Sequence, residues 1–590
     1  MSDGGLLLKR RGLGFGRLGS AKGGTALGAL VLALGISTPL GAQVLPGAVT
    51  PGRDRPGPPQ PTQTPDFDFS IVAPHRSPVP RAVDEVHFKL TGIMITGATT
   101  IPPTVFKPLW ESKIGKDITL ADILAIADQI EAAYRARGYL LVRAYVPPQR
   151  VANGLFTINV VEGYLANVTV QGGDDDVRSQ IHGYLRPATA ARPLTSETIE
   201  RGLLLTNDIP GITAAGVLKP SPDTPGASDL VVDVVQPWAT GGLAVDNRGS
   251  RFSGIWTIAG DVEFNSIFGA DQLAATVTAS PASTLGQVAG SLRYRRPLWD
   301  DGLIGSLIAS VTHGEPGSTL TAFNVLTDSW AVGPRLTYPV IRTRDETLLL
   351  DGGFTVQDAR VYVLGSSISH DKWRVLDIGG TYQRNNIAFL NSGSWSVTFD
   401  VAQGLPFLDA SPNRDPADPA RPNPAISRLG GKMDFTKVTA FSRLSVPLGG
   451  SFGVVFSGQG QFSFAKLITG EQVAFGGTQI GRGYDPGAIT GDDGLGGSLE
   501  LRYDYRVGKE WLQAVEPYVY VDGAQTWYNA EPLGSSLVDQ NIASVGGGVR
   551  FWLAYNITGA VEGSHTLHAV PGSDAGKEAT KLLLDLAIRF

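Results

Sequence analysis

The final ten residues, 581-KLLLDLAIRF-590, alternate between two kinds of side chain. One face of an extended chain would carry only apolar groups: Leu582, Leu584, Leu586, Ile588 and Phe590. The opposite face would carry Asp585, Ala587 and Arg589. Alternation with period two is typical of a β-strand, whereas soluble chains usually end in polar residues. The sequence therefore predicts a terminal strand with one face against a hydrophobic environment.

The same alternation recurs from residue 238 to the end of the chain, for example in WTIAGDVEF (256–264), WSVTFDV (395–401) and LRYDYRV (501–507). A tract of about 350 residues exceeds a single β-sandwich, and its aromatic residues suit a lipid-facing band. Strands in hydrocarbon must pair all their backbone groups, so the last strand should close on the first. At roughly 20 residues per strand and connection, we expect an antiparallel transmembrane barrel of about 16 strands in 238–590.

Composition limits the chemistry that the chain can perform. The 590 residues include 74 glycines and no cysteine, which excludes disulfides, zinc-thiolate sites and thiol nucleophiles. Removing residues 1–42, with five basic side chains and one acidic one, takes the formal net charge from −6 to about −10. So acidic a chain gives no reason to expect a nucleic-acid partner.

The amino-terminal region divides into two segments. Five basic residues precede the apolar run TALGALVLALGI and the small residues that end at Ala42, a pattern that predicts a secretory signal peptide over residues 1–42. A membrane anchor is the alternative, but the apolar run is short for one. Residues 43–82 are rich in proline, which favours an extended linker and argues against a long helix upstream of residue 66.

Residues 83–163 and 164–237 predict two successive α+β units. Each has the order strand, helix, helix, strand, strand. In the first unit Thr119 and Asp122 have the spacing of a capping box, and Gly138 follows the helix. In the second unit Asp174 to Asp176 precede a helix as a cap rather than as a calcium loop. Two such units form an internal repeat.

Several motifs carry a resemblance to a known family. They are FDFSIVAPHRSPVPRA (67–82), VVEGYLANVTVQG (160–172), AVDNRGSRFSG (244–254), IGRGYDPGAITGDDG (480–494) and YVYVDGAQ (518–525). Together with the signal peptide, linker, repeats and barrel, they resemble the two-partner secretion transporters, TpsB, of the haemolysin/haemagglutinin secretion-activation type. The repeats resemble POTRA domains. Ala524 departs from the glycine that is usual there.

The resemblance implies a function. The protein would be an outer-membrane pore of a Gram-negative bacterium, with POTRA domains in the periplasm that recognise an unfolded exoprotein. The partner would be a β-helical exoprotein with an amino-terminal secretion domain. Other partners would be outer-membrane lipid and the barrel assembly machinery for insertion. The alternative from the sister branch is a factor that assembles other barrel proteins.

The resemblance also implies particular residues. Arg482, Gly483 and Tyr484 would form the tip of a loop folded into the barrel, with Asp522 as the partner of Arg482. An ordinary arginine in a solvated loop is the plainer interpretation of the residues alone. The start of the barrel would be marked by Asp246, Asn247 and Gly249, and its closing strand by Leu586, Ile588 and Phe590.

Recognisable enzyme motifs are weak. No GxxxxGK[ST] loop is present, so we expect no ATP use. A GxSxG match around Ser451 lies between two alternating strands, which favours a turn over an outer-membrane hydrolase. His565 and His568 would lie on opposite faces of a strand, and we expect neither a metal site nor a cofactor.

Overall fold

A computed structural model describes residues 47–52, 69–71, 87–151, 153–224, 226–281, 286–413, 426–529, 539–570 and 579–590. The predicted signal peptide and most of the predicted linker lie outside these residues. No helix among the described residues is long and apolar enough to cross a membrane.

Two short elements of the predicted linker are described. Residues Gly47–Val49 form the 3-10 helix η1, and Phe69–Ile71 form strand β1. Val49 is buried in a cluster with Phe252, Leu320, Val325 and Val361 of the barrel region. Strand β1 pairs in parallel with β8 of the second α+β unit.

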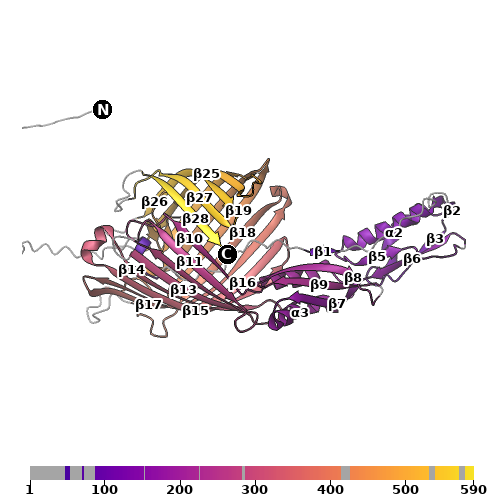
Figure 1. The fold of residues 1–590 in the computed structure, drawn as a ribbon, viewed down its shortest axis with the longest axis horizontal. Helices are drawn as coiled ribbons and strands as arrows, with labels where there is room; N and C mark the ends of the chain where they lie inside the picture. Colours follow the sequence, from indigo (N-terminus) through magenta and orange to yellow (C-terminus); the bar gives the residue numbers. More distant parts are fainter. Residues whose placement is uncertain are drawn as a thin grey trace, which may run out of the picture. The chain divides into compact units, whose positions relative to one another are not determined.

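The first unit contains the predicted strands and helices, with one strand, β4, that was not predicted between the two helices (Figure 1). Its elements are β2 (His87–Lys89), β3 (Gly92–Thr96), η3 (Pro103–Phe106), α1 (Pro108–Glu111), β4 (Asp117–Thr119), α2 (Leu120–Arg135), β5 (Val142–Tyr145) and β6 (Leu155–Glu162). The predicted capping box is present: Thr119 accepts from the Asp122 backbone N–H, and Asp122 accepts from that of Thr119. One face of α2 then packs on the β3-β6-β5 sheet.

The second unit repeats this arrangement. Its elements are β7 (Tyr164–Gly172), α3 (Asp175–Ala190), α4 (Ser196–Asp208), β8 (Thr213–Pro220) and β9 (Ala227–Val235). In both units the strand before the helices, β3 or β7, pairs in parallel with the last strand, which pairs antiparallel with the strand before it. Asp174 caps α3 by accepting from the Val177 backbone N–H, as its position predicts.

The remaining strands form a closed antiparallel barrel. They are β10 (Ala239–Asp246), β11 (Thr257–Asn265), β12 (Gln272–Ser280), β13 (Gly286–Pro297), β14 (Ile304–Glu315), β15 (Leu326–Arg342), β16 (Glu346–Val363), β17 (Ser366–Ile387), β18 (Gly393–Gly404), β19 (Thr436–Gly449), β20 (Phe452–Ser463), β23 (Asp493–Tyr503), β24 (Tyr505–Arg506), β25 (Leu512–Trp527), β26 (Gln540–Leu553), β27 (Ile557–Thr566) and β28 (Thr580–Arg589). Because β23 and β24 are two parts of one strand along β25, the seventeen labels make sixteen strands. The predicted fold and strand number are confirmed.

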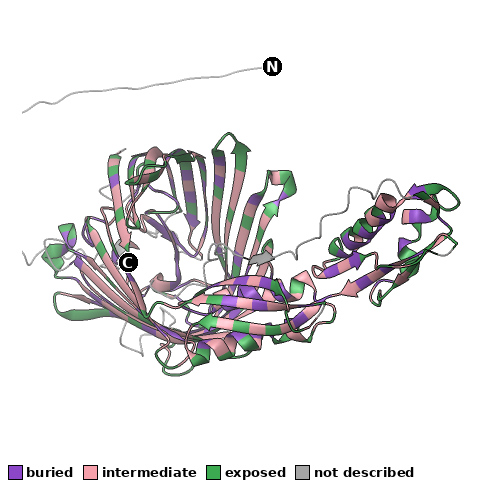
Figure 2. Cartoon of the chain, turned by 45° about the vertical axis from the view of Figure 1, so that its right-hand side comes forward, coloured by how far each residue is buried: buried purple, intermediate pink, exposed green. Residues whose placement is uncertain are grey.

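Buried and exposed residues alternate along the barrel strands (Figure 2). On β28, Leu582 is 63% exposed and Leu583 only 4% exposed. The carboxyl-terminal strand pairs with β10, which closes the barrel as predicted. Some aromatic residues depart from the expected outward position: Trp373, Tyr518 and Tyr520 are buried, and the polar atom of each donates a hydrogen bond to a buried partner.

Connections at the two ends of the barrel differ in length. At one end, the connections that follow β15, β19 and β26 have only two or three residues: 343–345, 450–451 and 554–556. Longer segments connect β18 to β19 and β20 to β23. Ser451 lies in the turn between β19 and β20 with a φ of 74°, which agrees with the turn predicted there.

Polar contacts join the second unit to the turn between β15 and β16. The guanidinium of Arg342 donates two hydrogen bonds to Asp208 of α4, at 2.8 and 2.7 Å. Arg201 of the same helix donates to the carbonyl oxygen of Pro339 at 2.8 Å. Because the chain enters the barrel directly after β9, this end of the barrel is the one that adjoins the two α+β units.

Candidate functional site: a loop tip held inside the barrel

The segment between β20 and β23 folds back against the inner wall of the barrel. It contains η6 (Thr469–Glu471) and the short hairpin of β21 (Val473–Phe475) and β22 (Ile489–Gly491). Phe475, Ile480, Tyr484 and Ile489 pack in one apolar cluster with Ala524 and Ile542 of the wall. The space for Phe475 exists because Gly494 and Gly496 have no side chain: a Cβ at either position would lie within 3.0 Å of its ring.

Arg482 lies at the tip of this hairpin and is 9% exposed. Its Nη1 donates to Glu500 Oε2 at 2.9 Å, and its Nη2 donates to Ser498 Oγ at 3.1 Å. Its backbone N–H donates to Asp522 Oδ2 at 3.1 Å, while Nε lies 3.8 Å from the same oxygen. The structure thus brings Arg482 and Asp522 together, but the shortest contact of the guanidinium is to Glu500.

The ring of Tyr520 supports the same guanidinium from one side. Arg482 Cζ lies 3.8 Å from the ring centroid, a distance at which a cation and an aromatic face attract each other. A Cβ at Gly546 would lie 2.6 Å from the Tyr520 hydroxyl, so the glycine leaves the room that the ring needs. The loop tip is therefore held by charge, hydrogen bonds and an aromatic surface together.

Glu562 of β27 connects this site with two further residues. Its Oε2 accepts from Tyr518 at 2.7 Å and lies 3.5 Å from Arg482 Nη1. Its Oε1 accepts from Arg248 Nη1 at 3.3 Å. Glu562 is 1% exposed, so its charge depends on these partners.

Close packing holds the tip as well. Gly481 has a φ of 82°, and a Cβ there would lie 2.4 Å from Ile542 Cδ1. At Gly483 a Cβ would lie 2.9 Å from Thr566 Cγ2 and 3.0 Å from Ser544 Cβ. The two glycines that flank Arg482 therefore let the backbone approach the wall closely enough for its hydrogen bonds.

Tyr484 and Asp485, which follow Arg482 in the loop, bind residues at the end of β27 and the beginning of β28. The Tyr484 hydroxyl donates to the carbonyl oxygen of His568 at 2.7 Å and accepts from that residue's backbone N–H at 3.1 Å. Lys581 of β28 pairs with Asp485 at 2.5 Å. Tyr484, expected from the resemblance to belong to the loop tip, thus attaches the tip to the residues that follow β27.

A second attachment holds the beginning of the loop on another part of the wall, formed by β17 and β19. Trp373 of β17 donates through Nε1 to Glu471 Oε1 at 2.7 Å, and Lys437 of β19 pairs with Glu471 Oε2 at 2.7 Å. Leu467 and Ile468 pack beside Trp373 in a fully buried apolar cluster. The loop is therefore bound to two separated parts of the barrel wall.

The residues expected to mark the barrel start surround the closure between β10 and β28. Asp246 accepts from the backbone N–H of Arg248 at 2.9 Å. The Asn247 amide donates to Leu582 O at 2.9 Å and accepts from Leu584 N at 2.7 Å. A Cβ at Gly249 would lie 2.0 Å from Gly254 O, so only glycine fits. On β28, Leu586 and Ile588 pair with Val245 and Leu243, and Phe590 exchanges backbone hydrogen bonds with Gly241.

One group of carboxylates among the described residues is close enough to hold a metal ion: Asp351, Asp377 and Asp400. Arg335 of β15 already lies among them, since it pairs with Asp351 and, at 2.5 Å, with Asp377. A buried guanidinium supplies positive charge in the position that a cation would take. The arrangement therefore reads as an internal ion-pair network of the barrel.

Sequence reasoning missed several of the residues that contact the loop tip. Glu500, Ser498 and Glu562 lie on the polar faces of ordinary barrel strands, and alternation identifies the face but not the residue that a distant loop will reach. Arg248 lies within the quoted motif of residues 244–254, yet its neighbours were selected instead. Its position directly after Asp246 and Asn247 was the available signal.

The fold and this site define a barrel transporter of the outer membrane, with two α+β units and a loop tip bound inside the lumen. The chain matches the family described as haemolysin secretion/activation protein ShlB/FhaC/HecB over residues 226–551, and a ShlB-type POTRA domain over residues 88–163. It belongs to this family, the transporters of two-partner secretion. The protein accordingly lies in the outer membrane with its POTRA region in the periplasm, and it moves a secreted exoprotein across that membrane.

Individual relatives and solved structures agree with this assignment. The chain is 21% identical to the heme/hemopexin transporter protein HuxB of Haemophilus influenzae strain 86-028NP, over 79% of this chain and 81% of that protein. It is 24% identical to the hemolysin transporter protein HpmB of Proteus mirabilis, over 76% and 78%. The structure of CdiB from Escherichia coli is similar with a TM-score of 0.65, at 18% identity over 88% of this chain and 93% of that one.

Proposed function

We propose that the POTRA domains capture an unfolded exoprotein and that the barrel passes it outward through a lumen that the Arg482 loop occupies at rest. In this proposal residues 1–42 direct export and 43–82 are a linker. The domains are 83–163 and 164–237, followed by the barrel of 238–590. The exoprotein is β-helical with an amino-terminal secretion domain, and the barrel assembly machinery inserts the transporter into lipid.

The observation that carries the proposal is the binding of the loop tip. Arg482 is buried among Glu500, Asp522 and Glu562, and Gly483 N donates to Ser544 Oγ at 3.2 Å. Removing one partner of a buried ion pair typically costs about 3–5 kcal/mol, because the others are left uncompensated. Arg482 therefore holds the loop in a defined position inside the lumen. Passage of a chain requires that the loop move away and return.

The substitution Arg482→Ala tests this role. We expect secretion to be lost while the barrel still inserts, as judged by its heat-sensitive migration in gels. The matched control is Arg502→Ala, which also removes an inward-facing guanidinium. Arg502 lies on β23 and pairs with Glu516 at 3.6 Å. Normal secretion by the Arg482→Ala variant would remove this residue from the mechanism.

Deletion of the transporter separates secretion from the assembly of other barrels. For a secretion pore, one large exoprotein disappears from the culture medium while other outer-membrane barrels keep their amounts. A general fall of barrel proteins in the membrane would instead support an assembly factor. The family match over 226–551 favours the first outcome.

A further inference from the structure

The closure between β10 and β28 has the shortest ladder among neighbouring strands of the described barrel. It comprises five residue pairs, from Gly242 opposite Arg589 to Asp246 opposite Asp585, extended by the two backbone hydrogen bonds between Gly241 and Phe590. The next shortest ladders have eight pairs. The two strands are also the ends of the barrel sequence, so no hairpin connects them. This seam therefore depends more than any other on side-chain contacts.

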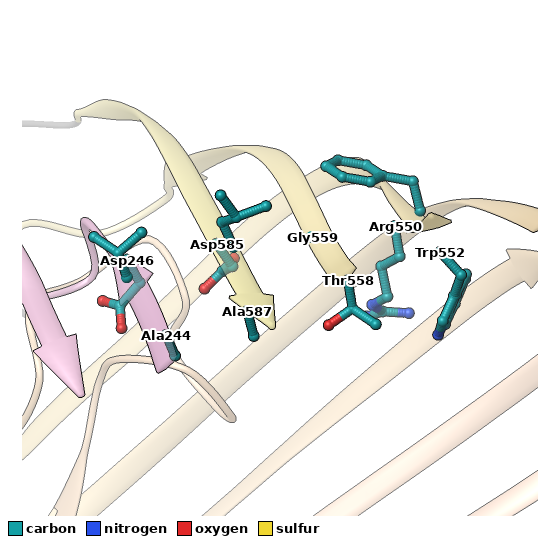
Figure 3. A pocket seen from close by; sticks show the side chains of 11 residues that line it. Ala244, Asp246, Arg550, Trp552, Thr558, Gly559, Asp585 and Ala587 are labelled. Carbon is teal, nitrogen blue, oxygen red and sulfur yellow. The ribbon is translucent and has the colours of Figure 1, made fainter. Parts of the chain in front are cut away.

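Arg248 supplies the strongest of these contacts on the inner side of the seam. It donates from Nε and Nη2 to the two oxygens of Asp585, both at 2.7 Å. Paired parallel hydrogen bonds of this kind are the preferred geometry of arginine with a carboxylate. Asp246 and Asp585 project to the same side of their strands (Figure 3). A cavity of about 420 Å³ lies beside them, lined also by Arg550 and Thr558.

The same arginine shares a carboxylate with the loop tip. Arg248 Nη1 lies 3.3 Å from Glu562 Oε1, and Arg482 Nη1 lies 3.5 Å from Glu562 Oε2. Glu562 is therefore placed between the cation of the seam and the cation of the loop. Tyr518 holds this carboxylate in place by donating to Oε2 at 2.7 Å.

Arg550, the other cation close to this cluster, is already occupied. It pairs with Glu500 at 2.8 Å and with Glu516 at 2.5 Å. When Arg482 withdraws, Glu500 therefore keeps Arg550 as its cationic partner, and Glu562 keeps Arg248. A buried carboxylate that loses one of two cations interacts more strongly with the one that remains, because less of its charge is compensated.

We propose that Arg248 is a positioning residue that closes the seam more firmly when the loop tip leaves Glu562. The inference rests on the proposed function, in which Arg482 moves away during passage. Its consequence is that the barrel wall is reinforced in the state in which a chain fills the lumen. The exoprotein then travels along the barrel axis and is not released sideways into lipid.

Amide hydrogen exchange of the full-length protein in detergent tests the coupling. The peptide that covers residues 582–590 reports opening of the seam, and no exoprotein is needed. We expect Arg248→Ala to accelerate the exchange of this peptide. The acceleration factor should be about threefold or more larger in the Arg482→Ala background than in the wild-type background, a size typical of coupling between ionic neighbours. Equal factors in the two backgrounds, or a smaller factor without Arg482, would overturn the inference.

Two control variants identify the origin of the effect. Glu562→Gln keeps the shape of the side chain without its charge, so the difference between the two backgrounds should vanish. Arg589→Ala removes another cation of β28, which pairs with Asp261 at 3.4 Å and does not contact Glu562. Its factor should be the same in both backgrounds. If Arg248→Ala does not insert, Arg248→Lys is measured in the same way, since lysine cannot form the paired hydrogen bonds.

A cysteine pair tests the direction of passage. Ala244 and Ala587 lie directly opposite each other across the seam, and the chain has no cysteine of its own. With Ala244→Cys and Ala587→Cys oxidised, secretion should continue, whereas loss of secretion that a reductant restores would contradict passage along the axis. Normal secretion by Arg482→Ala would refute the proposed role of Arg482 in secretion, but it would not change the result of the exchange experiment. Failure of the proposed function and failure of this inference are therefore distinguishable.

Discussion

Gly483→Ala is expected to unseat the loop tip without changing any charge. The new Cβ would lie 2.9 Å from Thr566 Cγ2, 3.0 Å from Ser544 Cβ and 3.1 Å from Ser564 Oγ. Ser544 Cβ belongs to the barrel wall and cannot rotate away, so the tip must shift. Overpacking of this kind costs about 1–3 kcal/mol, which corresponds to a rise of roughly 5- to 150-fold in the unseated population.

A thiol beneath the loop measures this population. Ala524 is 8% exposed and packs under Ile480 and Tyr484, so the thiol introduced by Ala524→Cys is shielded while the tip is seated. Its labelling rate with a charged maleimide, in intact outer membranes, should rise with the unseated fraction. The absence of native cysteine makes the signal specific.

Gly563→Ala is the matched control for this experiment. It lies one residue before Ser564, but the nearest atom to its new Cβ is 4.0 Å away. We expect no change in the labelling rate. If Gly483→Ala and Gly563→Ala label at the same rate, close packing does not hold the tip, and the argument from the glycines is wrong.

Three further outcomes are expected from the described contacts. Glu162→Gln should weaken the first POTRA domain by about 1.5–3 kcal/mol, measured as faster local hydrogen exchange at residues 99–100, because Glu162 accepts from both of these backbone N–H groups and from the Tyr134 hydroxyl. Burial opposes ionisation of Glu162, but these hydrogen bonds outweigh it and lower its pKa. The stabilisation is thus full above about pH 4.3 and is lost as the pH falls through the lower folded-state pKa, a dependence that the glutamine variant should lack. Arg335→Leu should lower the temperature at which the barrel loses its compact gel migration, because two buried carboxylates, Asp351 and Asp377, lose the guanidinium that they share; an unchanged temperature would show that Arg335 contributes nothing to the network. Thr119→Ala should cost the first POTRA domain about 1 kcal/mol in chemical unfolding through the lost helix cap, and a cost near zero would contradict the capping-box interpretation.

Much of the fold could be predicted from the sequence because period-two and helical patterns are local. The α2 cap at Thr119, the turn at Ser451 and the pairing of the last strand with the first follow from such patterns. The contacts of the loop tip could not be derived in this way. Glu500 and Glu562 are two among many inward-facing polar residues, and only the path of the folded loop selects them. The motif around Arg482 indicated the loop, but the residues that bind Arg482 could be identified only in the three-dimensional structure.

The strand β1 illustrates a different limit. Its residues, Phe69–Ile71, fall in the segment that proline content predicts to be an extended linker. They nevertheless pair with Gly216, Val217 and Leu218 at the edge of the second POTRA sheet. An extended segment without internal hydrogen bonds is available to complete a neighbouring sheet, but the sequence does not tell which edge it will meet.

The placement of the contacts along the chain sets an order for folding. The partners of Arg482 lie 16 to 80 residues away in sequence, whereas those of Arg248 lie 314 and 337 residues away. Closing a short loop costs less chain entropy than closing a long one, so local contacts form first. We therefore expect the carboxyl-terminal strands to assemble early around the inserted hairpin, and the first strand to join the last at a late step.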